Sequence, residues 1–214
     1  LEDPAMTSVP DLMPASPEML LVVGAMALLM VGVFATREAS RVVTGLSVAL
    51  MIGALVLVVT VEGGTTFHGA FVLDPFARFM KVLVLIGSGC AIAMSVGYAR
   101  AAKFDRFEYP VLIVLATTGM LMMISANDLI ALYLGLELQS LSIYVIAAIN
   151  RDSPRATEAG LKYFVLGALS SGMLLYGCSM IYGFTGSTNF DAIAAAVAAG
   201  GVSTGLVIGI VFLM

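Results

Sequence analysis

The sequence predicts an all-α fold, a polytopic transmembrane helix bundle with six complete spans and the start of a seventh. Two observations support this prediction. Of the 214 residues, 60% are hydrophobic and 11% are charged, whereas a soluble domain carries about a quarter charged residues. Apolar windows of about twenty residues, the length that crosses a bilayer, also recur along the chain. These windows should be helices, because hydrocarbon offers no partners for unpaired backbone groups.

The six complete windows are long, apolar and nearly free of charge. They occupy residues 17–35, 41–61, 75–98, 109–126, 128–148 and 160–184. A seventh apolar window begins near Thr204 and reaches about half the length of a span at Met214. Between the sixth and seventh windows, residues 189–199 are expected to form a short surface helix.

Capping residues mark the starts of two of these helices. Asp74 followed by Pro75 is typical of an N-cap and the first helical position. Asn127 and Asp128 are expected to cap the fifth helix, because short polar side chains there can accept hydrogen bonds from the first free backbone N–H groups.

The chain is expected to contain one folded domain. Residues 1–5 (LEDPA) precede Met6, a plausible natural start, and are predicted to be vector-derived. Residues 6–214 would then form the transmembrane domain. The first window is expected to be kept as a helix, since the residues before it carry acids and prolines but no basic signal-peptide region.

The basic residues predict how the helices are oriented. Placing the N-terminus outside puts eight of the ten Lys and Arg residues at the inner flanks, as the positive-inside rule requires. These eight are Arg37, Arg41, Arg100, Lys103, Arg106, Arg151, Arg155 and Lys162. Arg78 and Lys81 remain outside, where their long side chains are expected to extend to the outer interface. The other interpretation, which the sequence supports only weakly, is that they take part in an ion exit path.

Several classes of site are not indicated. The net charge of −4 comes from few charges and no broad basic face, so no nucleic-acid partner is expected. Cys90 and Cys178 lie in apolar runs, where a lone thiol acts as a small hydrophobic group. There is no C-x-x-C and no Cys/His pair at ligand spacing, so we expect no metal site and no bound cofactor.

Glu137 is the ionisable residue that the predicted spans place deep in the bilayer. An acidic group at a helix centre costs roughly 2.5–3.5 kcal/mol to insert, so it normally faces the bundle interior. Helical spacing puts it on one face with three hydroxyl-bearing residues and two leucines: Tyr133, Leu134, Ser140, Leu141 and Tyr144. One interpretation is a proton relay. The other is that Glu137 and Ser140 hold helices together by hydrogen bonds.

Glu158 and Lys162 form a second charged group, at the start of the sixth span. They are four residues apart in the order that favours a helical ion pair. In one interpretation Lys162 extends to the interface and neutralises Glu158. In the other, Lys162 lies close enough to Glu137 to modulate its proton affinity.

Two segments resemble a known family. NDLIALYLGLELQSLSIYV (127–145) followed by EAGLKYFVLGALSSG (158–172) closely resembles subunit N of the bacterial NADH:quinone oxidoreductase, respiratory complex I, the counterpart of mitochondrial subunit 2. DPFARFMK (74–81) also fits this family, and the resemblance covers 6–214. It implies an antiporter-like fold of two inverted five-helix repeats, each with a broken helix. Glu137 matches the family's glutamate on the fifth helix.

The same resemblance implies further expectations about these residues. Lys162 belongs to the matching sixth-helix motif. The seventh helix would be the broken helix of the first repeat; because this chain ends at Met214, that helix's lysine and the second repeat are absent.

The implied function is that of a proton-translocating membrane-arm subunit, which couples quinone reduction to proton transfer through buried ionisable residues. The chain would be a subunit of the enzyme without redox catalysis of its own, since FMN, iron–sulfur clusters and quinone belong to other parts of the complex. Its partners would be other membrane-arm subunits, including homologous antiporter-like ones, and the lipid bilayer. Its location would be the bacterial inner membrane, with a periplasmic N-terminus.

Two alternatives remain at this point. One is a subunit of a multisubunit cation/proton antiporter, a relative that also uses a buried glutamate on the fifth helix. Sodium-dependent transport without quinone would favour it. The other is a scaffold without transport, whose helices brace neighbouring subunits. It predicts that replacing Glu137 by glutamine leaves pumping intact.

Overall fold

The computed structural model describes residues 12–34, 39–101, 106–200 and 203–214. The predicted vector-derived segment 1–5 lies outside the described residues, as do Arg37 and Lys103 from the set of inner-flank cations.

Six long helices confirm the predicted transmembrane bundle. They are α1 (Ser16–Phe34), α2 (Ala39–Thr60), α3 (Pro75–Ala101), α4 (Glu108–Ser125), α5 (Leu129–Ala147) and α6 (Pro154–Thr185). All six have the length and hydropathy that a membrane span needs. A short 3-10 turn, η2 (Met13–Ala15), precedes α1.

Local signals explain where several helices begin. Asp74 accepts a hydrogen bond from the Ala77 N–H at 2.6 Å, which confirms the predicted cap of α3. The helix α6 begins six residues before the apolar window, because Ser153 caps it and Pro154 occupies its first turn. With 32 residues, α6 is about 48 Å long and exceeds the hydrocarbon core.

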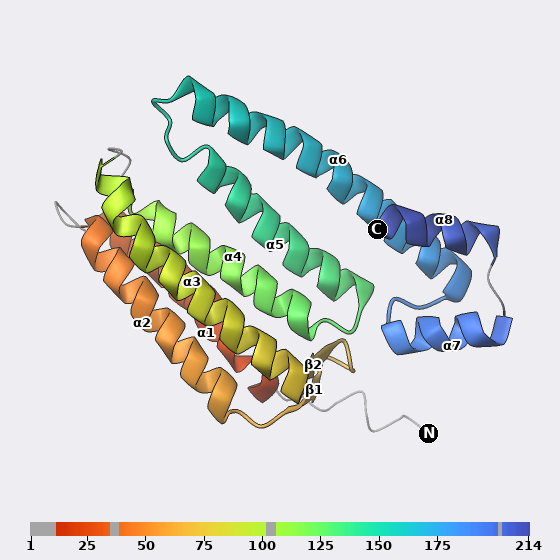
Figure 1. Cartoon of the computed structure of the whole chain (residues 1–214). Coiled ribbons are helices and arrows are strands. Elements are labelled where there is room, and N and C mark those ends of the chain that lie inside the picture. Colours follow the sequence, from red (N-terminus) through yellow and green to blue (C-terminus); the bar gives the residue numbers. More distant parts are fainter. Residues whose placement is uncertain (1–11, 35–38, 102–105, 201–202) are drawn as a thin grey trace.

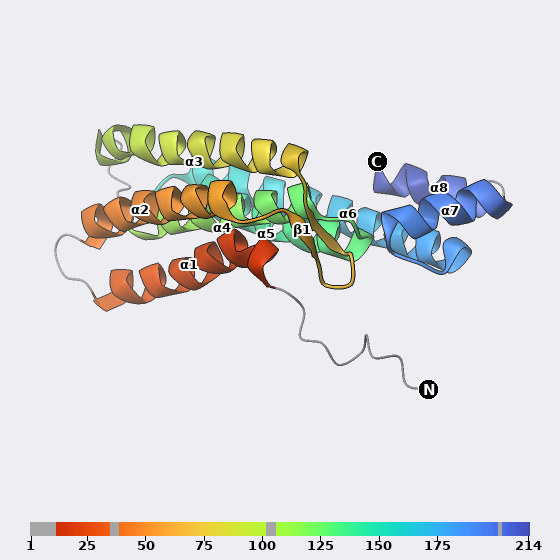
Figure 2. The same ribbon diagram turned by 90° about the horizontal axis from the view of Figure 1, so that it is seen from below.

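Two shorter helices follow α6 in the described part of the chain. The predicted surface helix is present as α7 (Phe190–Gly200), and the beginning of the seventh span is α8 (Thr204–Leu213). Figure 2 shows α7 and α8 beside the distal part of α6, beyond the ends of α1 to α3. There α8 packs closely on α6: a Cβ atom at Gly177 would lie 2.7 Å from the carbonyl oxygen of Gly209.

The first four helices share one apolar core. It contains Leu21 of α1, Val58 of α2, Ile92 of α3 and Leu121 of α4, all of which are fully buried. Figure 1 shows α5 lying against this group beside α4, and α6 following α5 at its outer side. A smaller core joins α6 and α8 through Cys178, Ile181 and Leu206.

A β-hairpin lies between α2 and α3, in a segment for which the apolar windows predicted no element. Strand β1 (Gly64–Thr66) pairs antiparallel with β2 (Phe71–Leu73), and Thr65 lies opposite Val72. The turn contains Phe67 and His68, both with positive φ. Non-glycine residues adopt this conformation rarely. Gly69 follows them, also with positive φ, but the turn holds no Asn-Gly pair, which is the ordinary hairpin signal.

The two ends of the bundle differ in charge. The basic end, where α1, α3 and α5 finish, carries the exposed cations Arg41, Arg106, Arg151, Arg155 and Lys162. The hairpin end, at which those helices begin, holds the β-hairpin together with residues 125–129 and 185–190.

Candidate functional site in the α5–α6 region

The helix α5 presents one line of side chains towards α6. The Tyr133 hydroxyl lies 3.1 Å from the Ser171 hydroxyl of α6. The Tyr144 ring makes edge contacts with Tyr163 and Phe164 of α6, at centroid distances of 4.8 and 5.9 Å. Glu137 lies on the same line as both tyrosines, because it is four residues after one and seven before the other. Its side of α5 therefore faces α6.

Glu137 is half-buried, and its Oε1 atom is fully shielded. Among the described residues, this oxygen has no hydrogen-bond partner. A buried polar atom without a partner costs free energy, so each such atom needs an explanation, such as strain, a catalytic role or an ordered water. An ionisable side chain within a membrane span is a candidate functional residue.

The face of α5 that packs against α6 is narrower than helical spacing indicated. Leu134 and Leu141, expected on the same face as Glu137, are 52% and 48% exposed. The tyrosines contact α6 while the leucines point away from the protein, because they lie at the edge of the helical face. The polar contacts of this face are thus concentrated between α5 and α6.

The opposite side of α5 is held against α4 by two glycines. A Cβ atom at Gly119 of α4 would lie 2.5 Å from the Gly135 carbonyl oxygen and 2.6 Å from the Gln139 nitrogen. Gly135 is two residues before Glu137 and so points to the other side of the helix. This close approach fixes the rotation of α5 and with it the direction of Glu137. Sequence analysis did not assign this role to either glycine.

Lys162 does not lie beside Glu137. Its Nζ is 2.5 Å from Glu158 Oε1, and the two side chains are 71% and 63% exposed. Gly160, two residues earlier, packs against Ala148 at the end of α5, since a Cβ atom there would lie 2.6 Å from the Ala148 Cβ. Lys162 consequently points to the other side of α6. The predicted ion pair with Glu158 is present, and the structure does not bring Lys162 and Glu137 together.

Sequence analysis did not predict a second internal charged site, a buried ion pair between α1 and α3. Lys81 of α3 is completely buried, and its Nζ lies 2.6 Å from Oε1 of Glu18 of α1, which is 6% exposed. The Phe71 ring lies 4.7 Å from the same nitrogen, within the range of a cation–π contact. The expectation that Lys81 extends to the outer interface is therefore wrong. Its carboxylate and aromatic partners let it stay inside, and Glu137 is not the only internal ionisable residue.

Arg78, the neighbour of Lys81 on α3, also turns towards the protein. Its guanidinium donates a 2.5 Å hydrogen bond to the Val61 carbonyl oxygen, just after α2. This bond ties the start of α3 to the segment that leads into the hairpin.

The loop between α4 and α5 connects the hairpin to α7. Asp128 accepts bonds from the Ile130 N–H and from the Thr188 hydroxyl, at 2.8 and 2.5 Å. The Asn127 amide donates to the Gly69 carbonyl oxygen and to the Asp191 carboxylate, at 3.2 and 3.0 Å. The predicted cap is thus confirmed for Asp128, whereas Asn127 bridges two other segments. Together they fix the starting point of α5.

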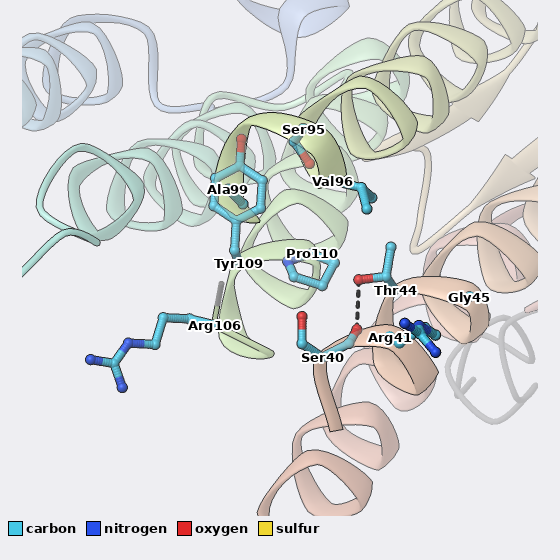
Figure 3. Close-up of a pocket in the computed structure, with 10 residues that line it drawn as sticks. All are labelled: Ser40, Arg41, Thr44, Gly45, Ser95, Val96, Ala99, Arg106, Tyr109 and Pro110. Atoms are coloured by element: carbon cyan, nitrogen blue, oxygen red, sulfur yellow. Dashed lines mark hydrogen bonds between the residues drawn. The ribbon is translucent and has the colours of Figure 1, made fainter. Parts of the chain in front are cut away.

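A cavity of about 240 Å³ opens at the basic end between α2, α3 and α4. Figure 3 shows the hydroxyl groups of Thr44, Ser95 and Tyr109 around it. The Thr44 hydroxyl donates to the Ser40 carbonyl oxygen at 2.7 Å. Neither Glu137 nor Lys162 lines this cavity. Within the described ranges, no group of three His, Cys, Asp or Glu residues is placed to hold a metal ion.

Comparisons with known proteins place this arrangement in a class. Residues 126–214 match the family model described as NADH:quinone oxidoreductase/Mrp antiporter, transmembrane. Respiratory complex I from Thermus thermophilus contains a chain that superposes with a TM-score of 0.75 and 25% identity, over 92% of this chain and 42% of that one. The Mrp complex of a Dietzia species gives a TM-score of 0.71 at 22% identity, over 95% and 40%, and shows the fold alone. The class is an antiporter-like transmembrane protein.

Curated relatives indicate one particular subunit within this class. NADH-quinone oxidoreductase subunit N 1 of Rhizobium meliloti is 64% identical over 211 residues, and subunit N of Parvibaculum lavamentivorans is 56% identical over 214. Each match covers 98% of this chain and 44% of the relative. The chain is a homologue of NADH-quinone oxidoreductase subunit N and spans less than half of the length of these relatives.

Proposed function

We propose that this chain forms part of a proton-translocating membrane-arm subunit of NADH:quinone oxidoreductase, in which Glu137 takes up and releases protons. The observation that carries the proposal is the Glu137 Oε1 atom, buried without a partner among the described residues on the side of α5 that faces α6. An intramembrane carboxyl group of this kind is typical of proton pathways.

The surroundings of Glu137 suit a proton relay. Tyr133, one turn away, contacts Ser171 through its hydroxyl, and Tyr144 packs on α6 two turns away in the other direction. A hydroxyl group can both donate and accept a hydrogen bond, so it can pass a proton between neighbours. In each transfer an O–H bond forms at the carboxyl group of Glu137 and later breaks, with no change in oxidation state.

The energy for this cycle would come from other subunits. FMN, the iron–sulfur clusters and the quinone would bind there, and their electron transfer would drive the proton steps through electrostatic coupling. The partners of this chain would be the other membrane-arm subunits, among them homologous antiporter-like ones. Lys162 would influence Glu137 only across the width of α6, because its side chain points away from α5.

The charges of the two ends support a bacterial inner-membrane orientation with a periplasmic N-terminus. The exposed cations Arg106, Arg151 and Arg155 lie at the basic end. At the hairpin end Lys81 is buried and Arg78 is bonded to the backbone. Exposed cations mark cytoplasmic loops, so the basic end would face the cytoplasm.

Infrared difference spectroscopy of the full-length parent complex tests whether Glu137 exchanges a proton. The spectrum recorded between the resting and the substrate-reduced complex should contain a carboxyl C=O band that Glu137→Gln removes. Glu158→Gln is the matched control, because Glu158 is exposed and paired with Lys162. A spectrum that Glu137→Gln leaves unchanged in the carboxyl region would refute the proposed role.

A subunit of a multisubunit cation/proton antiporter is the second candidate, since the matched family model includes Mrp antiporters. Proton movement driven by a sodium gradient in vesicles without quinone would favour this candidate. Proton movement that requires NADH and quinone would favour the oxidoreductase.

A further inference from the structure

A groove at the basic end combines apolar walls with charged groups at its mouth. It encloses about 210 Å³ between α1, α4 and α5. Its walls include Leu29 of α1, Leu115 of α4 and Val145 of α5, and its mouth carries Arg106, Glu108 and Arg151. Figure 1 shows α1 ending, α4 beginning and α5 ending at this end of the bundle.

The two arginines at the mouth are available to a ligand. Both side chains are exposed, and among the described residues neither guanidinium forms a hydrogen bond or an ion pair. Arg106 also borders the cavity of Figure 3, where its guanidinium points away from Thr44 and Ser40. Two guanidinium groups at one opening match the oxygens of a phosphodiester, which they bind by charge-assisted hydrogen bonds.

Glu108 gives the mouth a further property. Its Oε2 atom is buried and, within the described ranges, has no hydrogen-bond partner. A carboxylate accepts hydrogen bonds and repels other anions. The Glu108 carboxylate therefore suits a ligand with hydroxyl groups next to its phosphate. It repels a ligand that carries a carboxylate of its own. The charges of the three residues sum to +1, which one phosphodiester neutralises.

We propose that this groove binds an anionic phospholipid with a hydroxyl-bearing headgroup, phosphatidylglycerol. The phosphate lies between Arg106 and Arg151, and a headgroup hydroxyl donates to Glu108. From Glu108 to Leu115 the groove runs about two helical turns, or about 10 Å, along α4. A volume of about 210 Å³ admits the headgroup and the start of one acyl chain, and the rest of the lipid lies outside against exposed apolar side chains. The site is independent of the proton step at Glu137.

A photoactivatable phosphatidylglycerol tests this site in the full-length parent complex, reconstituted in phosphatidylcholine nanodiscs. Peptide mass spectrometry should find the label on α4 and α5 at the basic end, and unlabelled phosphatidylglycerol should compete better than phosphatidylethanolamine. Each arginine near an anionic headgroup contributes about fivefold in affinity. Labelling should therefore fall by about fivefold in Arg106→Gln or Arg151→Gln, and further in the double variant.

Matched variants separate the site from general surface charge and from misfolding. Arg155→Gln removes an exposed arginine at the same end that does not line the groove, and its labelling should equal that of the unmodified complex. Glu108→Gln should let a photoactivatable phosphatidylserine label the groove, because the repulsion between carboxylates is gone. Equal labelling in the double variant and in Arg155→Gln, with intact assembly, would overturn the proposal. So would competition by phosphatidylethanolamine as strong as that by phosphatidylglycerol.

Discussion

At the scale of single residues, three acidic side chains in or beside the spans have different partners. Glu18 is paired with Lys81 inside the bundle. Glu158 is paired with Lys162 at the surface. Glu137 has one buried oxygen with no partner among the described residues. Among these three carboxylates, only that of Glu137 is buried without a cation beside it in the described part of the chain, so the three groups are suited to different tasks.

The Glu18–Lys81 pair should be important for stability when only one partner is changed. Removing one member of a buried ion pair leaves the other charge uncompensated, which costs about 3–5 kcal/mol. We expect a loss of that size in the free energy of unfolding for Glu18→Gln and for Lys81→Met, measured by denaturant titration in detergent micelles. The double variant should lose much less than the sum of the two. Additive losses would show that the two side chains do not interact.

At the scale of elements, the direction of Glu137 depends on how closely α4 and α5 pack. In Gly119→Ala, the new methyl group would meet the backbone of Gly135 and Gln139. Overpacking of this kind costs about 1–3 kcal/mol. We therefore expect the free energy of unfolding in micelles to fall by that amount.

Gly172→Ala is the control for this change. Nothing lies within 4 Å of a Cβ atom at Gly172. The substitution should therefore be neutral or stabilise α6 by up to about 1 kcal/mol, because alanine has the higher helix propensity. Equal effects of the two substitutions would mean that the contact between α4 and α5 is not close.

The elements also show what the sequence could predict and what it could not. The six spans follow from hydropathy alone, because the hydropathy of each segment indicates by itself that the segment lies in lipid. The hairpin was missed because Phe67 and His68, which are neither glycine nor asparagine, take positive φ in the turn before Gly69. The Glu18–Lys81 pair was missed because its members lie on different helices, and a single sequence carries no spacing rule between them.

The predicted face of α5 agrees with the structure in part, for a related reason. Helical spacing placed Glu137 correctly with Tyr133 and Tyr144, since that relation lies within one helix. It also placed Leu134 and Leu141 on this face, although they are exposed. Which edge of a helix is covered depends on its neighbour, and only the packing of α5 between α4 and α6 determines it.

At the scale of the whole molecule, the chain is a helical bundle with a distal arm formed by α6, α7 and α8 (Figures 1 and 2). The loop with Asn127 and Asp128 ties this arm to the hairpin and to the start of α5. Changes in the position of the arm would therefore reach α5 through hydrogen bonds that converge on one loop. Glu137 lies on α5, the helix whose start these hydrogen bonds hold in place.

Proton pumping by the full-length parent complex in proteoliposomes tests the central claim most directly, with NADH:quinone turnover and assembly measured in the same preparations. A residue that carries the proton in a transfer step contributes about 100-fold or more to that step. Glu137→Gln should therefore close the path through this subunit and lower the number of protons pumped per NADH, while Glu158→Gln leaves that number unchanged. An assembled Glu137→Gln complex that pumps as many protons per NADH as the unmodified one would contradict the account and favour a scaffold.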